Sequence, residues 1–508
     1  MRPKSLSPII SMLIFFVLTS GVPFAAQGQI TVPIPTPGFL PDDLPPQKHG
    51  LYVQLGTDYF RFRQADVHGT SVLSLFYRTE SGLFIGNTVH SGAFGQGGGF
   101  FLGGFELGWI FPFVNSSELW ISGFLGGGGG AGQVPGEGMM LRPNISVMLP
   151  VFERTYLTGG LSYIYITGSP ISTPALNFSI QRKLNLAIAP GHYGSMPAFR
   201  GAIIIRAFKP ATRIYFPINS MKRRADQKLG NMYALGAEVG FAIRQHDEAF
   251  IQAHGVVAGD AEGYADWVLG YRRYFNMDFG KLSVAAGAGS AGGGAVNAGG
   301  GMILMAGGGL EIPLVSRFSM DIELMAIRSL NGDFMALAPG VRFVSLLERE
   351  GRTDTRFTYR WRAHSGIAIQ VPNKYYRKPG STNKKAPVMI EASMDLFLKD
   401  QFYVTGHAYT AFKGDAGGYQ LGLLGAGYTY ELNEYMDLSG ELYLGAGGGA
   451  AIETRGGLVS GGRVNLDVPL SGYLNASIGV GKLFAIGGRG MAPWTFHAGL
   501  TIPFLTFH

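Results

Sequence analysis

The chain has 508 residues, of which 78 are Gly, 12% are aromatic, 15% are charged and none is Cys. This composition excludes a collagen-like chain, which needs Gly at every third position, a disordered chain, which lacks such an apolar share, and any disulfide or thiol site. The formal net charge of +7 is concentrated in two segments described below, so we expect no nucleic-acid partner.

The first residues resemble an export signal. Arg2 and Lys4 precede an apolar run from Ile9 to Leu18, and small residues follow up to Gly28. This pattern predicts a cleaved signal peptide over residues 1–28. An uncleaved anchor is the alternative, although the run is shorter than the ~20 residues of a spanning helix. Residues 29–48 are rich in Pro and predict an extended leader.

From residue 49 onward, stretches of alternating apolar and polar residues are separated by polar turns. In the segment from Ile390 to Leu398, every second residue is apolar, and Glu391, Ser393 and Asp395 lie between them. This period of two predicts strands with one apolar and one polar face, and helical spacing is hard to find. The sequence therefore predicts an all-β chain.

An internal repeat divides this region into three copies. The turn around Pro150 recurs around Pro313 and Pro469, and a glycine tract precedes each turn, at 126–130, 287–294 and 445–449. We expect repeats over residues 49–185, 186–350 and 351–508, each with eight strands. In the third repeat we place these strands near 358–372, 387–398, 402–413, 417–431, 435–449, 456–468, 472–484 and 491–504.

The connections between these expected strands alternate in length. Those at 399–401, 433–434 and 469–472 are tight, whereas those at 373–386 and 486–493 are longer. Tight turns at one end and longer loops at the other are typical of outer-membrane barrels, with the tight turns in the periplasm. A sheet in lipid must also close, because a free edge would leave backbone groups unsatisfied.

Together with the signal peptide and the terminal strand from Trp494 to Phe504, these features resemble the bacterial outer-membrane β-barrel class over essentially the whole mature chain. The resemblance implies a transmembrane antiparallel β-barrel in the outer membrane of a Gram-negative cell, assembled by the barrel-assembly machinery. One departure is the end of the chain: the class usually ends in an aromatic residue, whereas here His508 follows Phe507 and Pro503 interrupts the strand. Side chains near strand ends suit the aromatic belts of such a barrel; they are Trp109, Phe111, Tyr428, Tyr430 and Trp494.

Three repeats of eight strands allow two arrangements. They can form one barrel of about 24 strands with a wide lumen, or three separate eight-stranded barrels with packed interiors. The join at 347–358 is short and charged, like another periplasmic turn. We therefore favour the single wide barrel and keep three barrels as the alternative.

Polar residues on the inward face are candidates for a lumenal network. They are His90, His254, His407, Glu238, Glu391, Asp395, Glu441, Arg463 and Asp467. The three His recur on the third strand of each repeat, and such side chains in one lumen suit a proton relay, a metal site or a hydrolase centre. We favour a plain hydrogen-bond network, because repeats copy structural residues too and no G-x-S-x-G or H-E-x-x-H motif is present. We assign no catalytic residue, metal or cofactor.

Two segments, which we expect to be extracellular loops, are strongly basic. Their basic residues are Lys209, Arg213, Lys222, Arg223, Arg224, Lys228, Lys374, Arg377, Lys378, Lys384 and Lys385. Such loops suit contact with lipopolysaccharide phosphates or the attraction of small anionic solutes; an ordinary solvated loop is the alternative.

The sequence thus predicts a passive, porin-like channel that is not an enzyme. A structural or secretion-associated scaffold that binds an envelope protein is the second hypothesis, and a lumenal lipid-modifying enzyme is the third.

Overall fold

The computed structural model describes residues 50–60, 67–131, 136–152, 154–184, 188–190, 204–222, 227–315, 318–346, 358–398, 401–433, 435–471 and 474–507. The expected signal peptide and leader lie outside these residues. Among the described residues, no helix is both long and apolar enough to span a bilayer.

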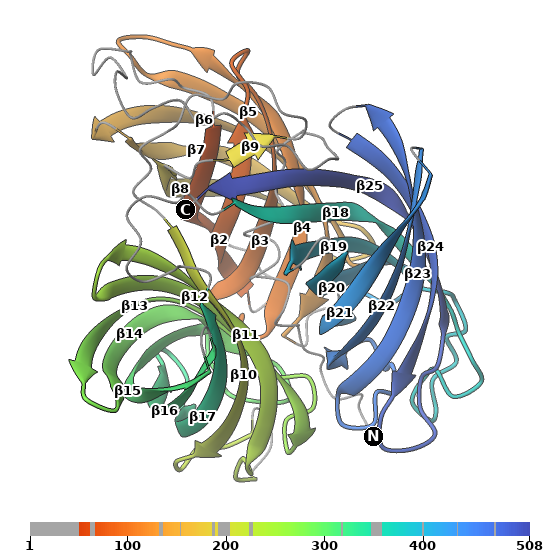
Figure 1. Ribbon diagram of the computed structural model, residues 1–508. Helices are drawn as coiled ribbons and strands as arrows, with labels where there is room; N and C mark the ends of the chain where they lie inside the picture. Colours follow the sequence, from red (N-terminus) through yellow and green to blue (C-terminus); the bar gives the residue numbers. More distant parts are fainter. Residues whose placement is uncertain are drawn as a thin grey trace.

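The described chain forms three closed eight-stranded antiparallel barrels (Figure 1). Barrel 1 consists of β1 (Gly50–Tyr59), β2 (Val67–Arg78), β3 (Leu83–Gly95), β4 (Phe100–Pro112), β5 (Glu118–Gly130), β6 (Met139–Phe152), β7 (Thr155–Ile166) and β8 (Ser172–Lys183). Barrel 2 consists of β10 (Ile204–Pro217), β11 (Met232–Arg244), β12 (Asp247–Gly259), β13 (Ala265–Met277), β14 (Gly280–Gly292), β15 (Met302–Val315), β16 (Phe318–Ser329) and β17 (Met335–Leu346). Barrel 3 consists of β18 (Thr358–Val371), β19 (Val388–Phe397), β20 (Phe402–Lys413), β21 (Gln420–Asn433), β22 (Met436–Gly448), β23 (Leu458–Ser471), β24 (Leu474–Ala485) and β25 (Trp494–Phe507).

Each barrel closes by pairing its own first and last strands. β1 pairs with β8, β10 with β17 and β18 with β25, all antiparallel. The all-β fold, the transmembrane type of barrel and the eight strands per repeat are confirmed. The preference for one 24-stranded barrel is corrected in favour of the alternative, three separate barrels, because the first strand of each repeat pairs within its own repeat.

The strands alternate in the opposite sense to those of a water-soluble barrel. On β16, Ile322 and Leu324 are 46% and 54% exposed, whereas Glu323 between them is 2% exposed. Apolar side chains also cover the outer surface of the other strands that face away from the neighbouring barrels, and the aromatic belt residues Trp109 and Trp494 are among them. An outer surface of this kind is stable in hydrocarbon and not in water.

The connections separate into two ends, as expected. At one end lie the turns at 79–82, 113–117 and 153–154 in barrel 1, with equivalents in the other barrels. At the other end lie longer loops, including 293–301, 372–387 and 449–457. We call these the short-turn end and the long-loop end.

The barrels stand side by side and contact one another through equivalent strands (Figure 1). The third strand of each barrel packs on the fifth and sixth strands of another: β3 on β14 and β15, β12 on β22 and β23, and β20 on β5 and β6. The third contact returns to barrel 1, so the three barrels form a closed ring with an approximate threefold arrangement.

Two kinds of contact hold this ring together. An apolar cluster is shared by all three barrels and includes Leu73, Phe101, Trp267, Trp361 and Met394. These outward-facing side chains are buried against other barrels and fill the region where the barrels meet. Near the long loops, the backbones approach more closely than side chains would allow. A Cβ at Gly99 would lie 2.6 Å from the amide nitrogen of Gly293, and a Cβ at Gly457 would lie 2.6 Å from the carbonyl oxygen of Val256.

A three-residue strand, β9 (Ile188–Pro190), lies between barrels 1 and 2 in the sequence but pairs with barrel 3. It pairs antiparallel with Phe504 to Thr506 at the end of β25. This end of β25 lies beyond the residues that β24 covers, since that pairing stops at Thr501. β9 therefore covers part of an edge that barrel closure leaves open.

Candidate functional site

The candidate site is the interior of the barrels, where inward side chains meet. In barrel 1 the centre is an ion pair between β6 and β1: Arg142 donates from Nε and Nη2 to Asp58 at 2.7 and 2.6 Å. His90 lies beside this pair, with Nδ1 3.3 Å from Asp58 Oδ2. Glu106 accepts hydrogen bonds from Thr88 and Ser122. These groups are almost inaccessible to solvent.

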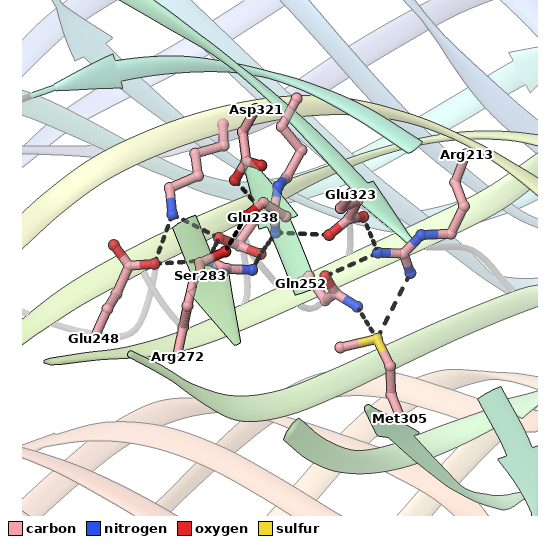
Figure 2. Close-up of polar contacts among 12 residues, drawn as sticks. Arg213, Glu238, Glu248, Gln252, Arg272, Ser283, Met305, Asp321 and Glu323 are labelled. Carbon is pink, nitrogen blue, oxygen red and sulfur yellow. Dashed lines mark hydrogen bonds and ion pairs between the residues drawn. The ribbon is translucent and has the colours of Figure 1, made fainter. Parts of the chain in front are cut away.

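Barrel 2 carries a larger charged network (Figure 2). Glu238 accepts bonds from Lys209 and Arg342 at 2.8 and 2.6 Å and also pairs with Arg272. Figure 2 shows how Glu248, Asp321, Glu323 and Arg213 surround this centre from other strands. Cations and carboxylates alternate, so the charges compensate one another inside the barrel.

His254 lies above this network, nearer the long loops. Its Nδ1 is 3.4 Å from Asp266 Oδ1 and 3.4 Å from Arg213 Nη1. Arg213 also donates to Glu323 at 2.5 Å, which links His254 to the charged centre.

The interior of barrel 3 combines Arg with His. Arg463 pairs with Glu391 and with Glu441, the latter at 2.7 Å. His407 Nε2 lies 3.0 Å from Glu441, and His497 Nδ1 lies 2.7 Å from Glu391. Nearer the short turns, Arg362 joins the two carboxylates of Asp395 and Asp467, at 2.7 and 3.0 Å.

Toward the long loops, an apolar plug closes each polar layer. The plug of barrel 1 includes Phe60, Phe100 and Phe124, that of barrel 2 includes Tyr264 and Phe334, and that of barrel 3 includes Tyr376 and Tyr419. Barrel 1 has a second apolar layer toward the short turns, in which the ring of Trp120 packs edge-on against Phe84 and at a tilt against Phe76. Eight-stranded barrels are narrow enough for side chains to fill them in this way.

The structure brings the expected lumenal residues together only in part. All of them face a barrel interior and are buried, but His90, His254 and His407 lie in three separate barrels and share no lumen. Their acidic neighbours also come from different strands of the repeat: Asp58 from the first and Asp266 from the fourth. A repeated catalytic pair would keep one geometry, so this variation favours a structural role for the three His. Among the described residues, no group of three His, Asp or Glu side chains has the arrangement of a metal site.

For the basic segments, one part of the expectation is wrong. Lys209 and Arg213 lie on β10, are 1% exposed and point into barrel 2; the loop begins after Pro217. Arg223 and Arg224 lie outside the described residues. Lys222 pairs with Asp260 at 2.6 Å, and Lys228, Lys374 and Lys384 are exposed.

The remaining basic residues of the 372–387 loop form contacts both within barrel 3 and with the neighbouring barrels. Lys378 donates to Glu262 of barrel 2 at 3.0 Å. Lys385 pairs with Asp415 at 2.6 Å, and this hydrogen bond lowers the pKa of the Asp415 carboxyl. Glu137 of barrel 1 accepts backbone N–H bonds from Gly414 and Asp415. Arg377 donates to the carbonyl of Ala450.

Sequence reasoning missed several interior residues, above all Arg142, Arg272, Arg342 and Arg362. A signal was present, since each lies on an expected strand with its charge flanked by outward apolar residues. The acids Glu137 and Glu262, which join barrels at the long-loop end, carry no such signal because they lie in loops.

Comparisons with known proteins give little beyond this geometry. No family model matches the chain, and no curated protein matches it. Among solved structures, OpdQ of Pseudomonas aeruginosa is 9% identical with a TM-score of 0.21, over 89% of this chain and 96% of that one. OpdK of the same organism, in a structure with vanillate, is 12% identical with a TM-score of 0.19, over 90% and 97%. The ferric enterobactin receptor PfeA of P. aeruginosa is 9% identical with a TM-score of 0.27, over 89% and 81%. Likenesses this weak carry no argument about function.

The class of the chain follows from its own surface. Closed antiparallel barrels, an outer face of exposed apolar side chains with aromatic belts and a polar interior define an outer-membrane β-barrel protein.

Proposed function

We propose that the protein is an outer-membrane scaffold in which three packed barrels act as one membrane-embedded body. The observation that carries this proposal is the burial of the interior. Glu238, His407 and His90 are at most 1% exposed in barrels 2, 3 and 1, and an apolar plug covers each layer. The apolar cluster shared by the barrels fills the region between them. Side chains packed in this way would leave water and ions no continuous path through the described part of the barrels.

The scaffold presents its functional surface at the long-loop end. There the loops of the three barrels meet through Glu137, Glu262 and the 372–387 loop, and exposed cations surround them. Such a basic surface suits an envelope protein partner or the phosphates of lipopolysaccharide. Because His90, His254 and His407 are all buried, we propose a non-enzymatic role.

A passive channel remains the second candidate, favoured by the charged interiors of barrels 2 and 3. A pore would open there only if a plug moved and water entered the charged layer. The exposed Lys228, Lys374 and Lys384 would then attract anionic solutes to its mouth.

Planar-bilayer recording of the purified mature chain separates the two candidates. For the scaffold we expect no ohmic conductance steps, while flotation with liposomes confirms that the protein has inserted. Regular steps that scale with salt concentration would instead establish a channel. Replacement of the three exposed Lys by Gln would then test the anion preference.

We further propose the arrangement of the chain across the membrane. The short-turn end faces the periplasm, where Gly50 begins β1 and the leader at 29–48 would lie, after removal of residues 1–28. The repeats would span 49–185, 186–350 and 351–508, and the barrel-assembly machinery would insert them. Sequencing of the mature N-terminus and protease accessibility of the 372–387 loop on intact cells test this arrangement.

A further inference from the structure

One lipid-facing position of barrel 3 breaks the apolar pattern of the outer surface. Across β18, β25 and β24, Val371 pairs with Trp494 and Trp494 with Lys482, so these three side chains form one outward row. The row below it, Ile369, Phe496 and Val480, is wholly apolar and exposed. Lys482 thus stands on the membrane side of the barrel, next to the long loops.

The same position is uncharged in the other barrels. Lys482 is the ninth residue of β24, and the ninth residues of β7 and β16 are Tyr163 and Ala326. A lipid-facing cation is costly within hydrocarbon and becomes favourable at the headgroup level, where it meets anionic groups. The charge of Lys482 is therefore specific to barrel 3 and is not a shared feature of the three repeats at this position.

Two further cations lie in the loops that follow this row of side chains. The ammonium of Lys482 itself lies 4.5 Å from the centre of the Trp494 ring. In the loops, Arg489 and Lys374 both face the ring of Tyr375, at 5.9 and 4.7 Å from its centre.

The loops that carry these cations are fixed to each other. Asn373 accepts the backbone N–H bond of Ala492 and donates to the carbonyl of Gly490. Among the described residues, no carboxylate forms an ion pair with Lys482, Arg489 or Lys374.

From this arrangement we propose that Lys374, Lys482 and Arg489 bind the phosphate groups of a phosphorylated glycolipid in the outer leaflet. The cations hold the phosphates by charge-assisted hydrogen bonds, and the exposed row of Ile369, Phe496 and Val480 receives the acyl chains. The inference rests on the proposed orientation, with the long-loop end facing outward.

Native mass spectrometry of the full mature chain in detergent tests this site with bisphosphorylated lipid A as the probe. Each cation near an anionic headgroup contributes roughly a fivefold factor in affinity. We therefore expect the triple variant K374Q/K482Q/R489Q to bind about a hundredfold more weakly, and dephosphorylated lipid A to bind weakly to the native chain. Lys482→Gln alone should cost roughly fivefold, which keeps the test available if the triple variant folds poorly.

Arg328→Gln is the matched control. Arg328 is an exposed, lipid-facing cation near the long-loop end of β16 in barrel 2, and its loss should leave lipid A binding unchanged. Three results would each overturn the proposal. The triple variant could bind lipid A as tightly as the native chain, or Arg328→Gln could weaken binding as much as the triple variant does. Inorganic phosphate could also displace lipid A at a similar concentration. Flotation of every variant with liposomes reports membrane insertion separately. A failure of the scaffold proposal can therefore be distinguished from a failure of the lipid-binding proposal.

Discussion

Replacement of Glu238 by Gln tests whether the interior of barrel 2 excludes water. The change keeps the shape of the side chain and removes one negative charge from a site that is fully buried. In the native protein this carboxylate pairs with Lys209, Arg272 and Arg342. Without this carboxylate, the positive charges of Lys209, Arg272 and Arg342 are no longer fully balanced by nearby carboxylates.

The expected cost depends on the surroundings of the network. Breaking a buried ion pair from one side destabilises a protein by about 3–5 kcal/mol. In a water-filled lumen the same pair would resemble a surface ion pair, worth about 1 kcal/mol or less. For the packed interior described above, we therefore expect Glu238→Gln to lower the free energy of unfolding of barrel 2 by about 3–5 kcal/mol.

Urea unfolding in lipid vesicles measures this difference. Trp267 is the single tryptophan of residues 204–346, so a chain whose other tryptophans are replaced by Phe reports barrel 2 by its fluorescence. Glu431→Gln, at an exposed position near the short turns of barrel 3, is the control and should change stability by less than about 0.5 kcal/mol. If Glu238→Gln cost no more than the control, the interior would be hydrated and the scaffold argument would fail.

Two further predictions concern the contacts between barrels. Gly99→Val should loosen the contact of barrel 1 with barrel 2, because the added Cβ would meet Gly293. Gly380→Val is the control, because Gly380 has a similar positive φ but a Cβ there would meet no atom within 4 Å. The yield of cross-linking between the loops of Gly99 and Gly293 should fall in the Gly99 variant alone, and equal yields in both variants would contradict the close approach. Leu73→Ala removes a side chain that is 3% exposed in the shared apolar cluster and should cost about 2–5 kcal/mol, whereas Leu161→Ala, at a position 56% exposed to lipid, should cost clearly less in the same urea assay.

Much of the fold could be predicted from sequence because strands in lipid carry a strict period. The expected strand at 402–413 matches β20, and the expected strands at 387–398 and 472–484 differ from β19 and β24 by one or two residues at each end. Each of these segments alternates apolar and polar residues between turns, so local pattern and tertiary structure agree.

The number of barrels could not be predicted in this way. Closure is decided by whether Gly56 pairs with Ser179, which is far away in the sequence, and no local pattern encodes that choice. The join at 347–358 is short and charged in sequence, and these properties suit a change of barrel as well as a turn, so they do not decide between the two arrangements.

The placement of the site residues also depends partly on contacts that are distant in the sequence and therefore could not be predicted from local patterns. Lys209 and Arg213 have the same parity as the inward Tyr215, but the basic residues that follow them in the sequence favour a loop. Residues of the Gly tracts permit close contact between barrels, such as Gly127 with Ala411 and Gly292 with Gly99, and these distant contacts leave no local pattern in the sequence.

The closed ring of barrels fixes the stoichiometry of the assembly within one polypeptide. In a trimer of identical subunits, every substitution would occur three times, and no interior could change without the others. Here each interior occurs once, and they differ: barrel 1 has a layer of aromatic rings, barrel 2 has Glu238 paired with Lys209, Arg272 and Arg342, and barrel 3 has both His407 and His497 beside its carboxylates. Covalent linkage thus allows barrel 3 to carry Lys482 at a lipid-facing position where the other two barrels have the neutral Tyr163 and Ala326.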